Sequence, residues 1–203
     1  MRTLPEIDAA DGAEAIAEAL AGYGACRISG AIAPGLSRAL CDDLGRLRAT
    51  GLLRPAAVGR QRNREWHPDI RGDATLWLSD PRCGDAARDF LAALDALRVE
   101  FNRLLFAGLR EVEAHYAVYP PGAGYARHRD RFRDDDARVL SWVTYLNEDW
   151  DEAEGGALRL HAGDGAIDVA PRIGASVCFR SELEHEVLPA SRERHSIAAW
   201  FRR

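Results

Sequence analysis

The chain has 203 residues, and 47% of them are hydrophobic, which is enough for one full core in a single domain. The formal net charge of −5 gives no bulk attraction to a phosphate backbone, so nucleic acid is not an expected partner. No segment approaches the roughly 18 apolar residues of a membrane span, and the N-terminal residues lack a continuous apolar stretch. We therefore expect a soluble cytoplasmic protein with no membrane partner.

Three amphipathic helices are predicted in the first half of the chain. Apolar residues recur at helical spacing in residues 11–24 and 33–51, and Pro34 stands where the second helix would begin. A longer helix is predicted within residues 84–108, where one apolar stripe contains Phe90, Leu94, Leu97, Phe101, Leu104 and Leu105. Residues 53–72, between the second and third helices, are polar, contain Pro and Gly, and predict a loop.

From Glu111 onward the hydrophobic period shortens to that of β-strands. Gly, Pro and Asp separate the β-rich runs, which cover residues 111–119, 138–146, 156–161, 166–170, 174–179, 185–190 and 195–201. Many short strands of this kind predict a sandwich, barrel or jelly roll. The three helices would then pack against one face of it.

The four cysteines, at positions 26, 41, 83 and 178, match no zinc-ligand or redox-pair spacing. We expect free thiols in a reducing compartment. A disulfide framework is the alternative, but a chain with its own core has little need of one.

A candidate metal site begins in the charged stretch 124–138. In an extended segment, residues two apart project to the same side, so His128 and Asp130 point together. His185 follows at the start of a later predicted strand. Two histidines and one carboxylate form the facial triad of non-haem Fe(II) oxygenases, which leaves open positions on the metal. A His-x-Asp pair alone also arises often by chance.

Arg194 lies nine residues after His185. We expect its strand to return antiparallel to the strand of His185, after the turn at residues 189–191, so that the guanidinium points into the same interior. A buried arginine keeps its charge and requires an anion, ideally a carboxylate held by two parallel hydrogen bonds. The position therefore predicts a ligand-binding role.

Five segments together resemble the iron- and 2-oxoglutarate-dependent prolyl hydroxylases, most closely the hypoxia-inducible-factor type and its bacterial relatives. The segments are "DIRGDATLW", "YPPGAGYARHRD", "YLNEDWDEAEGGALRL", "HEV" and "RHSIAAW", which lie between Asp69 and Phe201. The resemblance implies a mainly β fold, a double-stranded β-helix or jelly-roll barrel buttressed by about three N-terminal helices. It also implies one dioxygenase domain over residues 1–203. Residues 1–108 would supply helical support, the first strands and a substrate loop, and residues 109–203 the jelly-roll core with the metal site.

The same resemblance assigns roles to individual residues. It implies that His128, Asp130 and His185 bind Fe(II), and that Arg194 binds the far carboxylate of 2-oxoglutarate. Tyr145 would support that carboxylate through its hydroxyl group, and Tyr119 would line the cosubstrate pocket.

The implied reaction is 4-hydroxylation of a prolyl residue in a protein, with O2 consumed, succinate and CO2 formed, and ascorbate as a reductant. The implied partner is a protein with an exposed proline, for which a translation factor is one candidate. The enzyme would be a monomer or a weak dimer.

The expected substrate loop covers residues 59–72. Its polar character and Trp66 suit an extended peptide better than a small-molecule cavity, and we expect it to be mobile until substrate binds. Arg71 and Asp73 would anchor its end through salt links to the barrel, with Arg131 or Arg138 as a partner for Asp73. Trp200 would border the pocket.

Three alternatives remain. Hydroxylation of a free amino acid or another small molecule is the runner-up. A nucleic-acid demethylase of the same superfamily would carry a second arginine six residues after Arg194, where this chain has Trp200. A noncatalytic or zinc-binding cupin-like module would have no use for Arg194 and Tyr145.

Overall fold

The computed structural model describes residues 3–56, 70–131, 137–163 and 165–203. Three helices support the fold: α1 (Gly12–Gly22), α2 (Pro34–Ala49) and α3 (Asp85–Leu105). The short 3-10 turns η1 (Ala9–Asp11) and η3 (Glu152–Glu154) connect longer elements. The strands are β1 (Glu6–Asp8), β2 (Ala25–Ser29), β3 (Arg54–Pro55), β4 (Ala74–Trp77), β5 (Glu111–Tyr119), β6 (Tyr125–His128), β7 (Arg138–Tyr145), β8 (Leu158–Ala162), β9 (Gly165–Val169), β10 (Ala175–Arg180), β11 (His185–Val187) and β12 (Arg194–Arg202).

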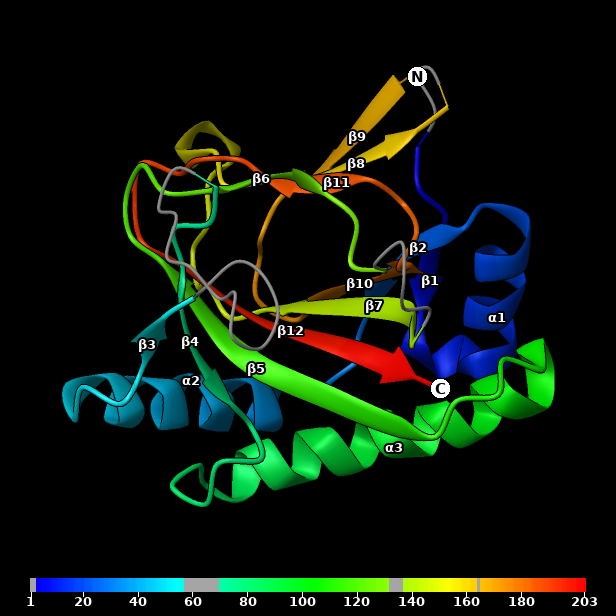
Figure 1. The fold of residues 1–203 in the computed structure, drawn as a ribbon, viewed down its shortest axis with the longest axis horizontal. Helices are drawn as coiled ribbons and strands as arrows, with labels where there is room; N and C mark the ends of the chain where they lie inside the picture. The colour runs from blue at the N-terminus through cyan, green and yellow to red at the C-terminus, as the bar shows by residue number, and fades with distance from the viewer. Residues whose placement is uncertain (1–2, 57–69, 132–136, 164) are drawn as a thin grey trace.

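The described strands form two sheets that lie one over the other. The larger sheet has the order β1-β2-β10-β7-β12-β5-β4-β3, and the smaller one the order β6-β11-β8-β9. Figure 1 shows α2 and α3 along the face of the larger sheet that is turned away from the smaller sheet. This is the predicted double-stranded β-helix with its helical support. None of the helices in the described ranges is long and apolar enough to cross a membrane.

The helices form where the sequence predicts them because their apolar stripes find a partner in the larger sheet. Pro34 begins α2, where its missing N–H would have no intrahelical acceptor. On α3, Phe90, Leu94 and Phe101 are buried, and the Phe101 ring meets Phe201 of β12 edge-on at 5.3 Å. Full burial of each such side chain contributes about 1.5–3 kcal/mol, so this layer holds the sheet firmly in place.

The two faces of the larger sheet have different tasks, and strand alternation separates them. On β12, Ile197, Ala199 and Phe201 pack toward the helices in the main core. The alternate residues, Arg194, Ser196, Ala198 and Trp200, line a pocket between the sheets. On β7, Trp142 likewise packs in the main core, whereas Tyr145 belongs to a second apolar cluster together with Leu158 and Leu160 of β8.

The strands differ from the sequence-based expectation in their number and in one pairing. The predicted β-rich runs did not include β3, β4 or β6, and β3 lies within residues 53–72, which were predicted to form a loop. The hydrophobic pattern did not predict β1 and β2, which pair in parallel and extend the larger sheet beyond β10. The expected pairing of the Arg194 strand with the His185 strand is wrong: β12 pairs with β5 and β7, whereas β11 pairs with β6 and β8. The chain crosses from the smaller to the larger sheet between β11 and β12, so consecutive strands are not neighbours.

The four cysteines are free, in line with the prediction. Cys26 and Cys178 are fully buried and face each other across β2 and β10. Burial raises the pKa of the Cys26 thiol to about 12, which keeps it protonated and unreactive.

Candidate active site

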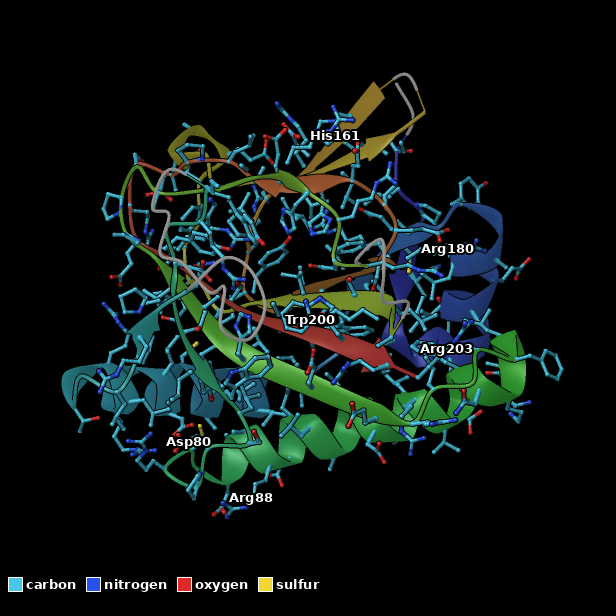
Figure 2. All side chains as sticks on the ribbon, viewed as in Figure 1. Asp80, Arg88, His161, Arg180, Trp200 and Arg203 are labelled. Carbon is cyan, nitrogen blue, oxygen red and sulfur yellow. The ribbon has the colours of Figure 1, made fainter. Side chains whose placement is uncertain are left out.

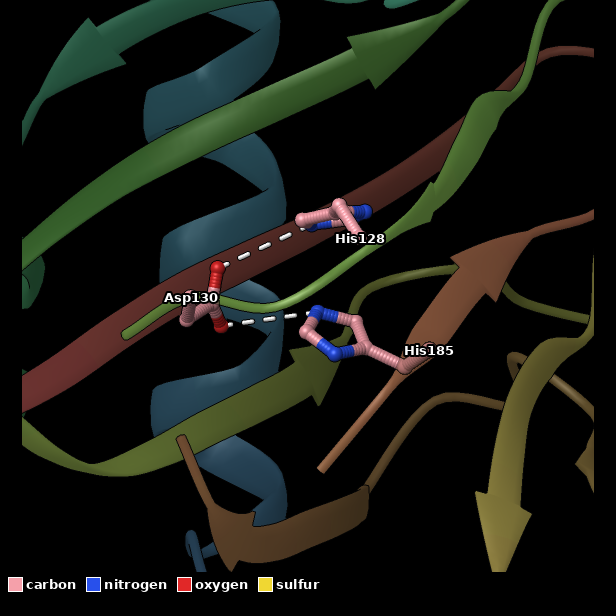
Figure 3. A group of neighbouring side chains, drawn as sticks. All are labelled: His128, Asp130 and His185. Atoms are coloured by element: carbon pink, nitrogen blue, oxygen red, sulfur yellow. Dashed lines mark ion pairs between the residues drawn. The ribbon is translucent and has the colours of Figure 1, made fainter. Parts of the chain in front are cut away.

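Two histidines and one aspartate meet between the sheets at the mouth of the barrel. His128 ends β6, His185 begins β11 as its cross-strand partner, and Asp130 lies two residues beyond β6. One potential ligand atom from each residue lies within 4.8 Å of the others. Figure 3 shows both imidazole rings turned toward the carboxylate, with His128 Nε2 3.7 Å from Asp130 Oδ1 and His185 Nε2 3.5 Å from Asp130 Oδ2.

Backbone carbonyl groups hold both rings in the tautomer that a metal ligand needs. His128 Nδ1 lies 2.7 Å from the carbonyl oxygen of Ala126, and His185 Nδ1 lies 2.9 Å from that of Leu183. Because a carbonyl oxygen only accepts, each Nδ1 donates its proton and each Nε2 keeps its lone pair. Burial lowers the pKa of His185, which keeps its ring neutral. Both lone pairs therefore face the carboxylate, where a cation would sit.

Asp130 is fixed by hydroxyl groups on the larger sheet. Ser141 Oγ of β7 donates to Asp130 Oδ2 at 2.7 Å and lies 2.8 Å from the hydroxyl of Ser181. Burial opposes ionisation of this carboxyl, but its interactions with the facing His185 and His128 outweigh burial and hold the pKa of Asp130 well below its ordinary value. The result is an ionised carboxylate of fixed orientation facing two imidazole nitrogens, a donor set suited to a divalent transition metal.

Arg194 is the buried cation of the same interior. Its residue is 1% exposed, Nε donates to the carbonyl oxygen of Gly156 at 2.9 Å, and Nη1 donates to Ser196 Oγ at 3.1 Å. It makes no ion pair with any carboxylate in the part of the chain that the structure describes. Because a buried guanidinium without a counter-ion is costly, the site favours binding of an anion. Although the predicted strand pairing was wrong, the prediction that Arg194 points into the interior matches its place on the inner face of β12.

Two tyrosines flank this guanidinium. The ring centroids of Tyr119 and Tyr145 lie 5.2 Å and 5.4 Å from the Arg194 guanidinium carbon. The Tyr145 hydroxyl is fully buried and has no hydrogen-bond partner among the described residues. Burial raises the pKa of Tyr145 to about 12, so the hydroxyl stays protonated and remains available as a donor. Together with Arg194 it provides donors for a carboxylate.

The outer end of the site is aromatic and opens into a cavity of about 450 Å³. The His115 ring lies 5.2 Å from both Trp77 and Trp200, and the Arg138 guanidinium stacks 3.6 Å from the Trp200 ring centre. Trp200 is labelled in Figure 2, on β12 between the helices and the smaller sheet. It lines this cavity and the pocket next to the triad.

The expected loop anchor differs in detail from the structure. Asp73 pairs with Arg71 at 2.7 Å and 3.0 Å, whereas Arg138 pairs with Glu113 and Arg131 with Glu182, so neither of the two expected partners reaches Asp73. The salt link lies within the segment, and backbone contacts with β6, such as the bridge between Arg71 and Tyr125, attach the segment to the barrel. Trp66 and the rest of residues 57–69 lie outside the described ranges.

Other charged residues of this region stay on the surface. Arg127 and Arg129 both pair with Glu184, so the charges next to the triad satisfy one another. His161 lies on β8 of the smaller sheet, away from the triad, and its Nε2 contacts Glu186 Oε1 at 2.9 Å. His195 contacts Glu193. Neither histidine belongs to the triad.

Sequence reasoning missed several residues that shape the site. The Tyr125 ring stacks on the His128 ring, with 3.6 Å between the ring centres and 15° between the ring planes. The Arg71 guanidinium carbon lies 4.8 Å from the centre of the Tyr125 ring. His115 is buried, donates from Nδ1 to the carbonyl oxygen of Tyr116 and approaches Arg71 through Nε2. For Ser141 the available signal was its shared strand face with Tyr145.

The comparisons with known proteins agree with this architecture. The model of the 2OG-Fe(II) oxygenase superfamily matches residues 114–202. A crystal structure of a Pseudomonas putida prolyl-4-hydroxylase is 45% identical, with a TM-score of 0.85, and the match covers 94% of this chain and 98% of that one. The chain belongs to the 2OG-Fe(II) oxygenase superfamily. Within that superfamily it falls in the prolyl hydroxylase family, as its sequence motifs suggested.

More distant relatives extend the match to animals. The hypoxia-inducible factor prolyl hydroxylase of Caenorhabditis elegans is 32% identical over 172 residues, which are 78% of this chain and 24% of the relative. Egl nine homolog 1 of Homo sapiens is 29% identical over 88% of this chain and 44% of its own length. The chain thus spans between about a quarter and about half of these curated relatives. A Trichoplax adhaerens prolyl hydroxylase solved with a hypoxia inducible factor peptide fragment is 26% identical, with a TM-score of 0.83, over 94% of this chain and 88% of that one.

The residues present fit the iron and cosubstrate of this superfamily. Two imidazole nitrogens and one carboxylate, all within 4.8 Å of one another, form the donor set of a facial triad. Among the residues that the structure describes, Arg194 has no carboxylate counter-ion and the buried Tyr145 hydroxyl has no hydrogen-bond partner. A bound dicarboxylate would satisfy both.

Proposed function

We propose that this protein is an Fe(II)- and 2-oxoglutarate-dependent dioxygenase that 4-hydroxylates a prolyl residue in a protein, with succinate and CO2 as co-products. The observation that carries the proposal is that the His128, Asp130 and His185 triad lines the same pocket as Arg194, next to the buried Tyr145 hydroxyl, which has no partner among the described residues. A metal triad alone would suit many modules. A triad that shares its interior with an anion site suits a keto-acid oxygenase.

Each residue has one task in this proposal. His128, Asp130 and His185 hold Fe(II), and the backbone carbonyl groups behind the two rings keep Nε2 unprotonated. Arg194 and Tyr145 hold the far carboxylate of 2-oxoglutarate, and Tyr119 forms a wall beside Arg194. Iron and cosubstrate, once bound, supply with O2 the oxidation that hydroxylates a C–H bond. The protein excludes water from the anion site and places one C–H bond of the substrate beside the metal.

The cavity outside the triad supports a peptide as substrate. Its volume is about 450 Å³, and its lining includes Trp77, Trp200 and the Arg138 guanidinium. Aromatic and cationic side chains at an open cavity suit an extended peptide segment. The Trichoplax adhaerens relative was solved with such a peptide. We further propose that residues 59–72, including Trp66, form the loop that binds this peptide substrate. Arg71 and Asp73 lie at the end of the loop that is attached to the barrel.

Further details of the proposal rest on the family resemblance. The substrate would be a protein with an exposed proline, such as a translation factor, rather than nucleic acid, and ascorbate would keep the iron reduced. The enzyme would work in the cytoplasm, a location that its free cysteines support. It would be a monomer or a weak dimer. Residues 1–203 would act as one dioxygenase domain, with residues 1–108 supporting the metal-binding core of residues 109–203.

The test is to incubate the protein with Fe(II), 2-oxoglutarate and cell proteins from the same source, and to search peptides by mass spectrometry for a gain of one oxygen on proline. Free proline is the second substrate arm. His128→Ala should abolish both hydroxylation and succinate formation while leaving the fold intact, because this partly exposed side chain contributes little to the core. His161→Ala is the matched control, because this histidine lies outside the triad and its side chain is about as exposed as that of His128, and it should remain active. Turnover by His128→Ala at the native rate would contradict the triad assignment, and preference for free proline would favour the small-molecule alternative.

A further inference from the structure

A second cavity, of about 650 Å³, lies apart from the active site. It forms where the ends of β1 and β2 meet the start of α2, and its walls include Arg27, Ile32, Ser37, Arg38 and Ile173. It shares no lining residue with the two pockets around the triad. Its volume falls within the roughly 300–1,000 Å³ of small-molecule sites, so it is large enough for a ligand of its own.

The first turn of α2 is open at this cavity. Ala33 precedes the helix and offers no side-chain cap, and Pro34 occupies the first helical position. The N–H groups of Gly35 and Leu36 have no acceptor four residues earlier inside the helix, because the helix has only begun. The 16-residue helix also directs the positive end of its dipole to this point.

A buried hydroxyl group in the same turn lacks a partner. Ser37 is 3% exposed and lines the cavity, yet its Oγ makes no hydrogen bond to any described residue. Buried hydroxyl groups are nearly always hydrogen-bonded in folded proteins. An acceptor atom of a bound molecule at the start of α2 would satisfy it. This observation is independent of the helix terminus and points to the same place.

The charges around the cavity are close to balanced, and Arg38 is the cation next to Ser37. Arg27 pairs with Glu6 at 3.0 Å and Arg172 with Glu152 at 3.1 Å, so these two arginines are already neutralised. Arg38, one residue after Ser37, makes no ion pair with a carboxylate in the described ranges. Glu148 carries a negative charge on the cavity lining, where its side chain is exposed.

The remaining walls are apolar. Ile32 is buried next to the start of α2, Ile173 lies just before β10, and Ala175 is the first residue of β10. These side chains would contact the body of a ligand rather than its charged end. The cavity therefore combines an anion-binding end with an apolar surface.

We propose that this cavity binds a small organic anion, a carboxylate or phosphate carried on an apolar body. The anionic end lies at the start of α2, between the Ser37 hydroxyl and the Arg38 guanidinium, and the apolar body lies against Ile32 and Ile173. This site is separate from the 2-oxoglutarate site and does not depend on the proposed hydroxylase activity.

Isothermal titration calorimetry of the full chain with octanoate and with octyl phosphate tests the proposal. The probe that binds with the higher affinity identifies the preferred head group. The titration uses the Arg194→Ala background, so that the cosubstrate anchor cannot hold the probe. Saturable binding at one site is expected. Arg38→Ala should weaken it about threefold to fivefold, the size of a solvent-accessible ion pair. Ser37→Ala should weaken it about twofold to tenfold, the range for one hydrogen bond.

Two further variants make the test discriminating. Arg48→Ala changes an arginine at the other end of α2, which pairs with Glu193, and should leave the affinity unchanged. Glu148→Gln removes the carboxylate of the lining that makes no ion pair with a described residue, and the probes should bind this variant equally well or more tightly. The proposal is overturned if neither probe binds saturably up to about 10 mM, or if Arg38→Ala behaves like Arg48→Ala. Tighter binding of octylammonium, with Glu148→Gln weakening it, would identify a cation site instead.

Discussion

Replacing Tyr145 by phenylalanine separates a cosubstrate role from a structural one, because its hydroxyl has no partner within the described structure. A buried hydroxyl without a hydrogen bond costs about 1–3 kcal/mol of stability. The Tyr145→Phe variant without cosubstrate should therefore be as stable as the native protein, or more stable by up to about that amount. Urea denaturation in the absence of 2-oxoglutarate measures this.

The same variant should bind 2-oxoglutarate more weakly. A hydrogen bond to a carboxylate contributes about 1.5–3 kcal/mol, so the 2-oxoglutarate concentration needed for half-maximal succinate formation should rise about tenfold to a hundredfold. Tyr116→Phe is the matched control, because that buried hydroxyl donates to Asp43 at 3.1 Å. It should lower stability and leave the 2-oxoglutarate requirement unchanged. If Tyr145→Phe behaved like Tyr116→Phe, its hydroxyl would serve the fold and the reasoning would be refuted.

Three further predictions concern the rest of the site. Arg194→Ala should raise the 2-oxoglutarate requirement at least tenfold, since truncating one partner of a buried charge pair costs about 2–5 kcal/mol; an unchanged requirement in a succinate assay would move the anchor elsewhere. Burial lowers the pKa of His115 to about 4, so the unfolded chain binds more protons between that value and its ordinary pKa. Stability should therefore fall by up to about 3 kcal/mol as pH decreases through this window, and His115→Phe should lose that part of the slope in parallel denaturation curves. Deleting residues 60–67 should spare the uncoupled decay of 2-oxoglutarate but remove hydroxylation of protein substrate, and intact protein hydroxylation would exclude the loop from recognition.

The sequence was most informative where one strand face carries the chemistry. Residues two apart on an extended segment share a side, so the convergence of His128 and Asp130 followed from their spacing. The same rule placed Arg194 and Trp200 on one face of their strand. Alternation identifies a face but not a neighbouring strand, and this is why the pairing of β12 was predicted wrongly.

Contacts between segments far apart in the sequence were beyond such reasoning. Tyr125 stacks on His128 and meets Arg71, which comes from a different part of the chain, and no spacing within one segment reveals that stack. The wrong assignment of Asp73 has a similar cause, because Arg71, Arg131 and Arg138 are all close candidates by charge. Only the fold decides which of them reaches the carboxylate.

The two halves of the candidate site belong to different sheets. His128 and His185 are carried by the smaller sheet, whereas Arg194 and Tyr145 are carried by the larger one. The separation between metal and carboxylate anchor is therefore set by the apolar side chains packed between the sheets, among them Leu160 and Val177. Substitutions that change the thickness of this layer would alter the fit to keto acids of different length without altering any ligand, so core packing would help to determine the choice of cosubstrate.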